Sequence, residues 1–244
     1  NLMMKIKHLK SPNYIHCNKT RNIQSVVIHY TGMRSLQSAV ERLLSKKYEV
    51  SSHYLISRTG KIIQLVKDNN IAWHAGISNW FKFKNLNKNS IGIELENKGH
   101  QYGYQAFPSK QIVQLIKILK ILKRKFKIKN INITGHSDIA PNRKIDPGEK
   151  FPWKKLYKND LAIWHSLDEQ FIKNFRLKKL ININKKNMLR MIKKLGYTRV
   201  LTADSLDKDF IKAFQRRYRQ DLINGIFDQE CYLILNNLQN SFNS

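Results

Sequence analysis

The stretch from residue 135 to residue 148 holds the side chains in this sequence that are best suited to chemistry. It places His136, Lys144 and Asp146 in a loop that contains two prolines and closes on a glycine. Residues 131–134 alternate apolar and polar side chains and predict a strand, so His136 should lie at a strand end. Proline and glycine restrict the turn that follows, which would let Asp146 fold back toward His136. One imidazole and one carboxylate are two of the three protein ligands that a catalytic zinc site normally uses.

The third ligand would have to come from another part of the chain, and His29 is the strongest candidate. The run Ser25–Tyr30 is mostly β-branched and apolar, which predicts a buried strand with His29 near its carboxyl end. Strand ends are places where a rigid fold presents side chains to a cleft. The alternative is that His29 and His136 are two unrelated histidines, each hydrogen-bonded in its own surroundings. Spacing alone leaves both interpretations open.

Five motifs occur in the order found in a known enzyme family. They resemble those of the zinc-dependent N-acetylmuramoyl-L-alanine amidases of the AmpD and AmiD type, which are related to phage amidase lysozymes and peptidoglycan recognition proteins. The resemblance covers about residues 20–158. A shorter match at 213–215 and 224–225 resembles the small helical peptidoglycan-binding domain that AmiD carries. The five motifs are residues 27–31, 50–56, 72–76, 90–97 and 135–148.

This resemblance implies a function, a cofactor and a set of site residues. The chain would hydrolyse the amide bond between N-acetylmuramic acid, or its 1,6-anhydro form, and the L-alanine of peptidoglycan stem peptides, in cell-wall turnover or recycling. Its Zn²⁺ would be held by His29, His136 and Asp146, whereas some phage relatives use a cysteine as third ligand. Lys144 occupies the position of the family's transition-state lysine. Peptidoglycan or muramyl-peptide fragments are the implied partners.

Amide hydrolysis also needs a base that takes a proton from water and passes it to the leaving amine. Glu94 and Glu96 share one face of a strand predicted at residues 90–96. Both could instead line a solvated face of the sheet. The resemblance favours Glu94 as the catalytic carboxylate and leaves Glu96 as the second choice.

A cation near the proposed ligands would stabilise the oxyanion that develops during hydrolysis. Lys144 lies two residues before Asp146, so both side chains could reach the same side of an extended loop. In so basic a chain, an ordinary surface lysine is the alternative. Arg143 could also compete for this role.

Four further residues are candidates for contact with substrate. Trp73 could stack on a sugar and His74 could bind a peptide carboxylate, because both precede the flexible Gly76. Core packing of Trp73 and a structural hydrogen bond of His74 are the alternatives. Asn97 and Arg143 complete the set on weaker grounds.

The alternation of predicted strands and helices indicates an α/β fold with a mixed central sheet flanked by helices. A long helix is predicted from Pro108 to about residue 125, because apolar residues recur there at helical spacing. Beyond a connector at 173–186, three amphipathic helices are predicted at 185–195, 205–218 and 228–238. We therefore expect an amidase domain at residues 1–175, with an N-terminal extension, and a small helical, peptidoglycan-binding-like domain at 180–244.

The net charge of +28 has three possible origins. Basic proteins bind nucleic acid through phosphate neutralisation, and they also bind anionic wall polymers. The third origin is a general bias toward Lys, Asn and Ile, which we favour for much of the charge. Since no recognisable nucleic-acid motif accompanies the lysines, no specific nucleic-acid partner is expected.

Other features set the outer limits of the interpretation. No apolar run approaches the roughly 18 residues of a membrane span, so no transmembrane segment is expected. Cys17 and Cys231 fall in different expected domains and form no disulfide framework. We expect a monomer, in the bacterial envelope or periplasm or, without export, in the cytoplasm. The competing functions are a zinc-free peptidoglycan-recognition module and a basic nucleic-acid-binding protein.

Overall fold

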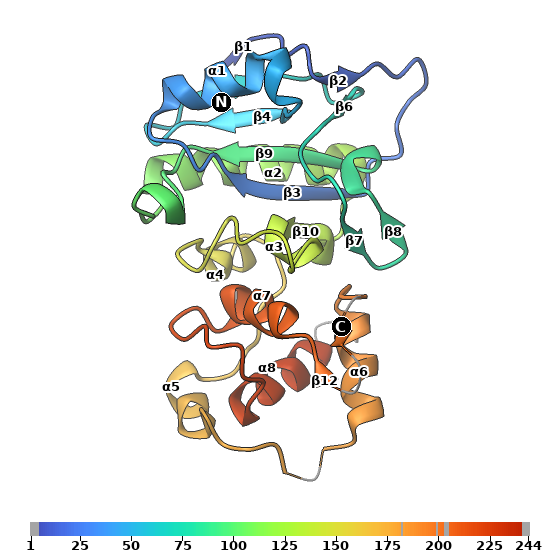
Figure 1. Cartoon of the computed structure of the whole chain (residues 1–244), viewed down its shortest axis with the longest axis vertical. Coiled ribbons are helices and arrows are strands. Elements are labelled where there is room, and N and C mark those ends of the chain that lie inside the picture. Colours follow the sequence, from blue (N-terminus) through green and yellow to red (C-terminus); the bar gives the residue numbers. More distant parts are fainter. Residues whose placement is uncertain (1–4, 182, 199, 203–204, 241–244) are drawn as a thin grey trace.

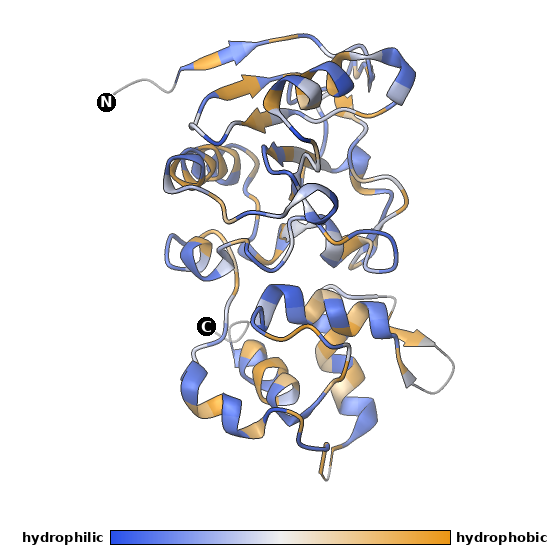
Figure 2. Cartoon of the chain, turned by 60° about the vertical axis from the view of Figure 1, so that its left-hand side comes forward, coloured by the Kyte–Doolittle hydropathy of each residue, from blue (hydrophilic) through white to orange (hydrophobic). Residues whose placement is uncertain are grey.

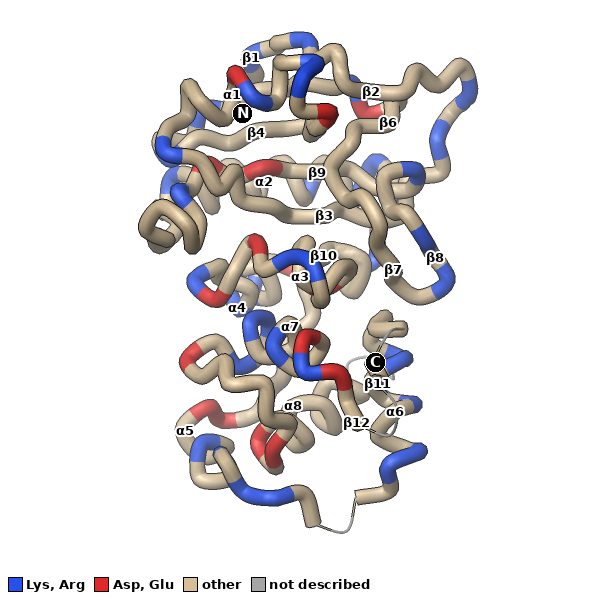
Figure 3. The backbone as a smooth tube through the Cα atoms, in the orientation of Figure 1, with Lys and Arg blue, Asp and Glu red and all other residues tan. Residues whose placement is uncertain are grey.

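The computed structural model describes residues 5–181, 183–198, 200–202 and 205–240. Figure 1 shows an α/β part, which holds the main sheet, and a helical part below it that contains the end of the chain. Lys and Arg positions occur along both parts in the view of Figure 3. Among the described residues, no helix combines the length and apolar character that a membrane crossing requires.

The main sheet has six strands in the order β1-β5-β4-β9-β3-β10. The pair β4 and β5 is antiparallel and the other neighbouring pairs are parallel, which confirms the predicted mixed α/β sheet. The central strands β9 and β3 are the longest, and their apolar side chains are buried. The strands are β1 (Ile6–His8), β3 (Ser25–Tyr30), β4 (Tyr54–Ile56), β5 (Ile62–Gln64), β9 (Ser90–Leu95) and β10 (Ile133–Gly135).

Two helices pack on opposite faces of this sheet. Helix α2 (Ser109–Phe126) follows Pro108, as the sequence predicts, and buries Ile112, Leu115 and Leu119 in the larger core together with Ile56. Helix α1 (Leu36–Leu44) begins at Ser35, whose side chain accepts a hydrogen bond from the backbone of Ser38. It packs against a separate cluster that includes Leu55. Since consecutive strand residues point to opposite faces, Ile56 and Leu55 assign the two helices to opposite sides.

Six short strands form three antiparallel pairs outside the main sheet. Each pair lies within the connecting segments of the chain and contributes few buried side chains. They are β2 (Tyr14–Ile15) with β6 (Ile71–Ala72), β7 (Asn79–Trp80) with β8 (Phe83–Lys84), and β11 (Leu201–Thr202) with β12 (Ser205–Leu206).

The remaining helices are short except in the C-terminal part. Figure 2 shows that the C-terminal helices have a hydrophobic and a hydrophilic side, as the amphipathic pattern predicts. The α-helices are α3 (His136–Ile139), α4 (Trp153–Tyr157), α5 (Glu169–Ile172), α6 (Lys185–Lys194), α7 (Lys208–Tyr218) and α8 (Gln229–Asn240). The 3₁₀ turns are η1 (Lys46–Tyr48), η2 (Leu86–Lys88), η3 (His100–Tyr102), η4 (Asn130–Asn132) and η5 (Lys173–Phe175).

Two expectations about these elements were wrong in detail. His136 does not lie in a loop but begins α3, a single helical turn directly after β10. Ser205 does not begin the next long helix, because it pairs in the short strand β12 and Asp207 caps α7 instead. Residues that favour turns or helix caps are found at both places, and such residues fit several local structures. The exact element boundaries therefore do not follow from the sequence alone.

The two parts of the chain share one continuous hydrophobic core. Buried side chains of the sheet, such as Ile133, belong to the same cluster as Phe210 and Phe214 of α7. Arg176, in the predicted connector, forms an ion pair with Glu230 of α8, so the connector is bound to the C-terminal helices. The C-terminal helices therefore pack against the α/β part through a shared apolar core as well as being joined to it by the chain.

Candidate metal centre and active-site cleft

Three side chains from separate elements converge at the carboxyl end of the central strands. His29 comes from β3, His136 from the start of α3, and Asp146 from the turn that follows. His29 Nδ1 lies 3.0 Å from His136 Nδ1, and each of these nitrogens lies 3.1 Å from Asp146 Oδ2. All three residues are buried. The structure thus brings together the three residues that the sequence nominates as ligands.

The protonation of His29 follows from a chain of hydrogen bonds that begins away from the site. The Ser90 hydroxyl donates to the Leu86 carbonyl at 2.6 Å, so its oxygen accepts the proton on Nε2 of His74 at 3.1 Å. Nδ1 of His74 is then an acceptor, and His29 Nε2–H donates to it at 3.0 Å. Because a neutral imidazole carries one proton, Nδ1 of His29 presents a lone pair to the other two ligands.

His136 has the same tautomer for a different reason. Its Nε2–H donates to the Ala75 carbonyl oxygen at 3.1 Å, so in the neutral imidazole Nδ1 carries the lone pair. Burial lowers the pKa of His29 to about 4, with a further contribution from the neighbouring His136, so its imidazole is neutral near pH 7. A ring nitrogen of each histidine and a carboxylate oxygen of Asp146 therefore face one another.

A bound cation would stabilise this convergence of two imidazole nitrogens and a carboxylate oxygen. Zinc bonds of about 2.0–2.1 Å in a tetrahedral arrangement put ligand atoms about 3.3 Å apart, close to the 3.0–3.1 Å separations of His29, His136 and Asp146. Two imidazole nitrogens and one carboxylate oxygen are also a donor set that zinc uses in hydrolases. The residues present fit a bound metal ion.

The loop that carries Asp146 is fixed by bonds to its backbone. Ser137 donates its backbone N–H to the Asp146 carbonyl at 2.8 Å, which ties the turn to α3. The Tyr104 hydroxyl donates to the Pro147 carbonyl at 2.6 Å. Gly148 has a φ of +82°, and a side chain there would collide with the ring of Tyr104. The turn that carries Asp146 is thus held from two sides.

Glu94 lies beside His29 on the neighbouring strand. It is the register partner of His29 in the parallel pair of β3 and β9. Its Oε2 is buried and has no hydrogen-bond partner among the described residues. Burial raises the pKa of Glu94 to about 8; the charge of Asp146 raises it further and Lys144 opposes the shift. A buried, unpartnered carboxyl oxygen next to a metal site is suited to hold and deprotonate a water molecule.

These residues line a cleft of about 430 Å³. Lys144 and Trp73 contribute to its wall, as the sequence suggests. Tyr30, Gln101 and Tyr102 also line it and were not nominated from the sequence. Tyr30 directly follows His29, so its place in the same motif was the available signal, whereas nothing local marks residues 101 and 102.

The other nominated residues have different surroundings. One terminal nitrogen of Arg143 donates to the Ala75 and Ile77 carbonyls at 2.9 and 2.8 Å, although the residue also lines the cleft. Asn97 is buried and donates to the Gln105 carbonyl at 2.8 Å. His74, as described above, has both ring nitrogens engaged by protein groups.

Glu96 faces a different environment from Glu94. Its carboxylate accepts the backbone N–H of Arg58 at 2.8 Å, in the turn that joins β4 and β5. His53 is not one of the three converging residues: its Nδ1 accepts the Gly92 N–H at 3.0 Å, and its ring centre lies 5.8 Å from that of His74. The two carboxylates that the sequence could not separate thus lie in different places.

Comparison with known sequences places this chain in a family. A sequence model of the Amidase_2 family, described as N-acetylmuramoyl-L-alanine amidase, matches residues 19–149. N-acetylmuramoyl-L-alanine amidase AmiD of Escherichia coli is 36% identical over 229 residues, which span 87% of this chain and 80% of that protein. The 1,6-anhydro-N-acetylmuramyl-L-alanine amidase AmpD of Haemophilus influenzae is 32% identical over 172 residues, 63% of this chain and 91% of its own.

Solved structures give the same result over nearly the whole chain. Escherichia coli AmiD, in complex with the substrate anhydro-N-acetylmuramic acid-L-Ala-D-γ-Glu-L-Lys, superposes with a TM-score of 0.76 at 31% identity, over 94% of this chain and 98% of that one. AmpDh3 of Pseudomonas aeruginosa superposes with a TM-score of 0.79 at 28% identity, over 94% and 96%. Both similarities extend beyond residue 149, where the match to the family model ends.

Proposed function

This chain belongs to the N-acetylmuramoyl-L-alanine amidase family, and on that premise we propose that it is a zinc enzyme whose ligands are His29, His136 and Asp146. The reaction is hydrolysis of the amide between the lactyl carbonyl of N-acetylmuramic acid, or its 1,6-anhydro form, and L-alanine. The observation that carries the metal assignment is the convergence of three lone-pair donors, two of them oriented by hydrogen bonds to the protein.

Each catalytic group has a role that follows from its position. Bound zinc supplies Lewis acidity and lowers the pKa of water to about 7. Glu94 takes the proton of the attacking water and delivers it to the leaving nitrogen of L-alanine, since its Oε2 has no hydrogen-bond partner within the described part of the chain. The Lys144 ammonium stabilises the oxyanion that forms at the lactyl carbonyl. Glu94 and Lys144 both line the cleft beside the ligands.

The same cleft is proposed to bind the sugar and peptide of the substrate. Trp73 offers an aromatic face beside the ligands, which suits stacking on the muramyl ring. Arg143 is proposed to act mainly by shaping the wall of the cleft, and Asn97 by holding the segment that follows β9, because their polar atoms bind backbone carbonyls. The structure of Escherichia coli AmiD with an anhydro-muramyl peptide supports an anhydro-muropeptide as substrate here.

We also propose that the C-terminal helices, residues 180–244, bind peptidoglycan. The structural similarity to AmiD and AmpDh3 over this region supports the proposal, as does the density of lysines on α6. Binding of this kind raises the effective concentration of enzyme near the polymer. The proposed boundary between the two domains, at residues 175–180, lies in the segment that the Arg176–Glu230 ion pair binds to α8.

The test is hydrolysis of an anhydro-muramyl tripeptide by purified protein, followed by mass spectrometry together with a measurement of bound zinc. We expect release of anhydro-N-acetylmuramic acid and the L-alanyl peptide, with close to one zinc ion per chain. Binding of the substrate without cleavage would support the zinc-free recognition module instead. If the His136→Ala variant loses both zinc and activity, the bound zinc is required for hydrolysis.

A further inference from the structure

We propose that Arg217, in the C-terminal helix α7, is a positioning residue for the metal centre. It acts through Asp138, which lies on the same helical turn as His136. The C-terminal helices would then be needed to assemble the metal site, in addition to any part in wall binding. This inference rests on the proposed role of His136 as a metal ligand.

Asp138 is a buried carboxylate whose two oxygens are fully engaged. Oδ2 accepts the backbone N–H of Gly135 at 2.7 Å and an N–H of Arg217 at 2.5 Å. Oδ1 accepts the hydroxyl of Tyr197 at 2.7 Å. Only 2% of the residue is exposed. Among the described residues, Arg217 is the only cation in an ion pair with it.

Arg217 holds the start of β10 as well as α3. Its second terminal nitrogen donates to the Ile133 carbonyl at 3.1 Å, and its guanidinium lies 4.0 Å from the ring centre of Trp153 in α4. The residue is 2% exposed. One side chain of the C-terminal part therefore fixes the strand that leads into α3, the helical turn itself and the helix beyond it.

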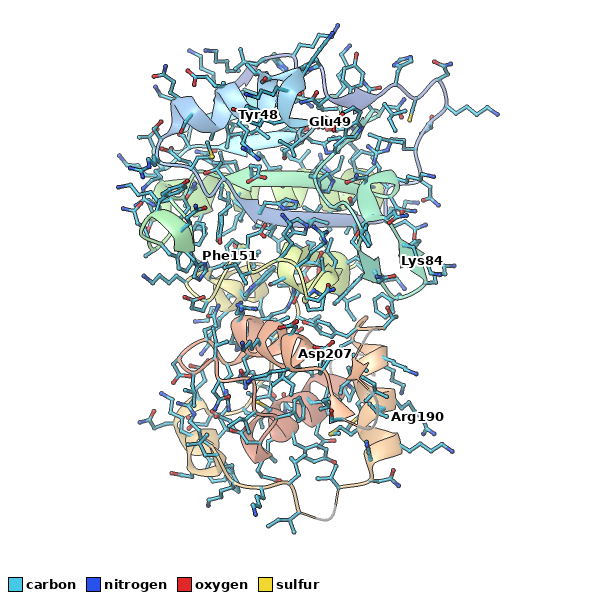
Figure 4. The ribbon with its side chains drawn as sticks, in the orientation of Figure 1. Tyr48, Glu49, Lys84, Phe151, Arg190 and Asp207 are labelled. Carbon is cyan, nitrogen blue, oxygen red and sulfur yellow. The ribbon has the colours of Figure 1, made fainter. Side chains whose placement is uncertain are left out.

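The rest of the interface holds α7 and the end of α6 against the α/β part. Phe81 donates its backbone N–H to the Gly196 carbonyl at 2.9 Å, and Gln220 donates to the Phe151 carbonyl at 2.7 Å. Figure 1 shows α7 adjacent to α3, and Figure 4 labels Phe151 and Asp207 on the two sides of this boundary. Gly196 packs so closely on Trp80 that a side chain there would collide with the indole ring.

Helix α3 is unable to keep its geometry alone. It has four residues, and a single helical turn is unstable in isolation because its nucleation is unfavourable. The side chain of Asp138 caps the backbone N–H of Gly135, the residue before His136. A buried carboxylate that loses its cation is strongly disfavoured, so without Arg217 this turn should open to let water reach Asp138. His136 would move with it, away from His29 and Asp146.

The experiment compares Arg217→Met with Arg219→Met in the full chain. Arg219 is a matched control, because it forms a buried ion pair with Asp228 inside the C-terminal part, away from α3. Both variants should lower the melting temperature. Only Arg217→Met should weaken zinc binding, measured by competition with a chelator, by about 10–100-fold, the range known for loss of groups that orient metal ligands.

Two further variants test the mechanism. Arg217→Lys should recover part of the zinc affinity, because it restores the charge but not the planar fork. The double variant Arg217→Met with Asp138→Asn should bind zinc better than Arg217→Met alone, because no unpaired charge remains buried. With a soluble substrate under zinc-saturating conditions, kcat should fall in Arg217→Met while KM changes little.

The outcomes separate this inference from the proposed function. Wild-type protein without zinc or hydrolysis would contradict the function. Side-chain NMR of the histidines in zinc-free protein tests the inference even then, since the His136 signal should shift in Arg217→Met and stay constant in Arg219→Met. Equal loss of zinc affinity in both variants, or none in Arg217→Met, would overturn the inference. If Arg217→Met fails to fold, Arg217→Lys and the double variant decide the question by the same measurements.

Discussion

His29 and Glu94 are register partners on the adjacent parallel strands β3 and β9. Neighbouring strands lie about 4.8 Å apart, so the backbone ladder itself fixes the separation between a proposed metal ligand and the proposed base. Both residues lie near the carboxyl ends of the two longest strands of the sheet. The most rigid part of the fold thus carries two groups whose relative position matters for hydrolysis.

Glu94→Gln should bind zinc normally and lose kcat by about 10²–10⁴-fold, the range for removal of a general base. The amide keeps the shape of the side chain but does not take up a proton. Zinc content and initial rates on an anhydro-muramyl peptide check this. Glu96→Gln is the matched control and should keep its rate within about twofold, because Glu96 binds the Arg58 backbone instead. A fully active Glu94→Gln enzyme would exclude the assigned base.

Lys144→Met should lower kcat by about 10²–10³-fold, as expected when one group that stabilises an oxyanion is removed. KM should change less, since the ammonium acts on charge that develops in the transition state. The exposed Lys98→Met variant controls for the general loss of positive charge. A change confined to KM would make Lys144 a substrate-binding residue rather than a catalytic one.

His74→Leu should reduce zinc affinity by about 10–100-fold, because the side chain that accepts the Nε2 proton of His29 is lost. Chelator competition gives the affinity. Gly92→Ala should act in the same direction, since a methyl group there would collide with the imidazole of His74. Wild-type affinity in both variants would mean that His29 is oriented by its strand alone.

Removal of the metal should destabilise the protein as well as inactivate it. A ligand that binds only the folded state stabilises it by about 2.7 kcal/mol at 100 times its dissociation constant. A chelator should therefore lower the melting temperature of the wild type, and added zinc should restore it. The His29→Ala variant should show no such response, and a response equal to that of the wild type would place the ion elsewhere.

The zinc-free protein should lose stability as the pH falls from about 6.5 to 4. Burial lowers the pKa of His29 and of His53 to about 4 and lowers that of His74 well below its usual value. Below pH 6.5 the unfolded chain binds protons at these sites and the folded chain does not. Each proton taken up only by the unfolded chain lowers the free energy of unfolding by about 1.4 kcal/mol per pH unit. Three such protons lower it by up to about 4 kcal/mol per pH unit. Denaturation curves between pH 7 and 5 measure this slope, which the exposed His16→Asn variant should leave unchanged.

The sequence alone determined the elements whose side chains repeat with a clear period. Helix α2 and strands β3 and β9 lie where the apolar spacing predicts them, because each buries one continuous face or run. The motifs around His29, Glu94 and His136 could also be recognised from the sequence alone, because each is a short contiguous segment. Helix α3 was missed because a single turn next to prolines has no period to detect.

Only the tertiary structure decided how distant residues act on the site. It separated Glu94 from Glu96, which share the same alternation: an oxygen of Glu94 has no hydrogen-bond partner among the described residues, whereas Glu96 accepts a backbone N–H. It joined Arg217 to Asp138 across 79 positions of the chain. Ion pairs and hydrogen-bond chains of this kind depend on where separate elements pack, and a buried charge shows no local pattern that names its partner. Local patterns therefore identified the reacting groups, and packing determined which side chains hold them in place.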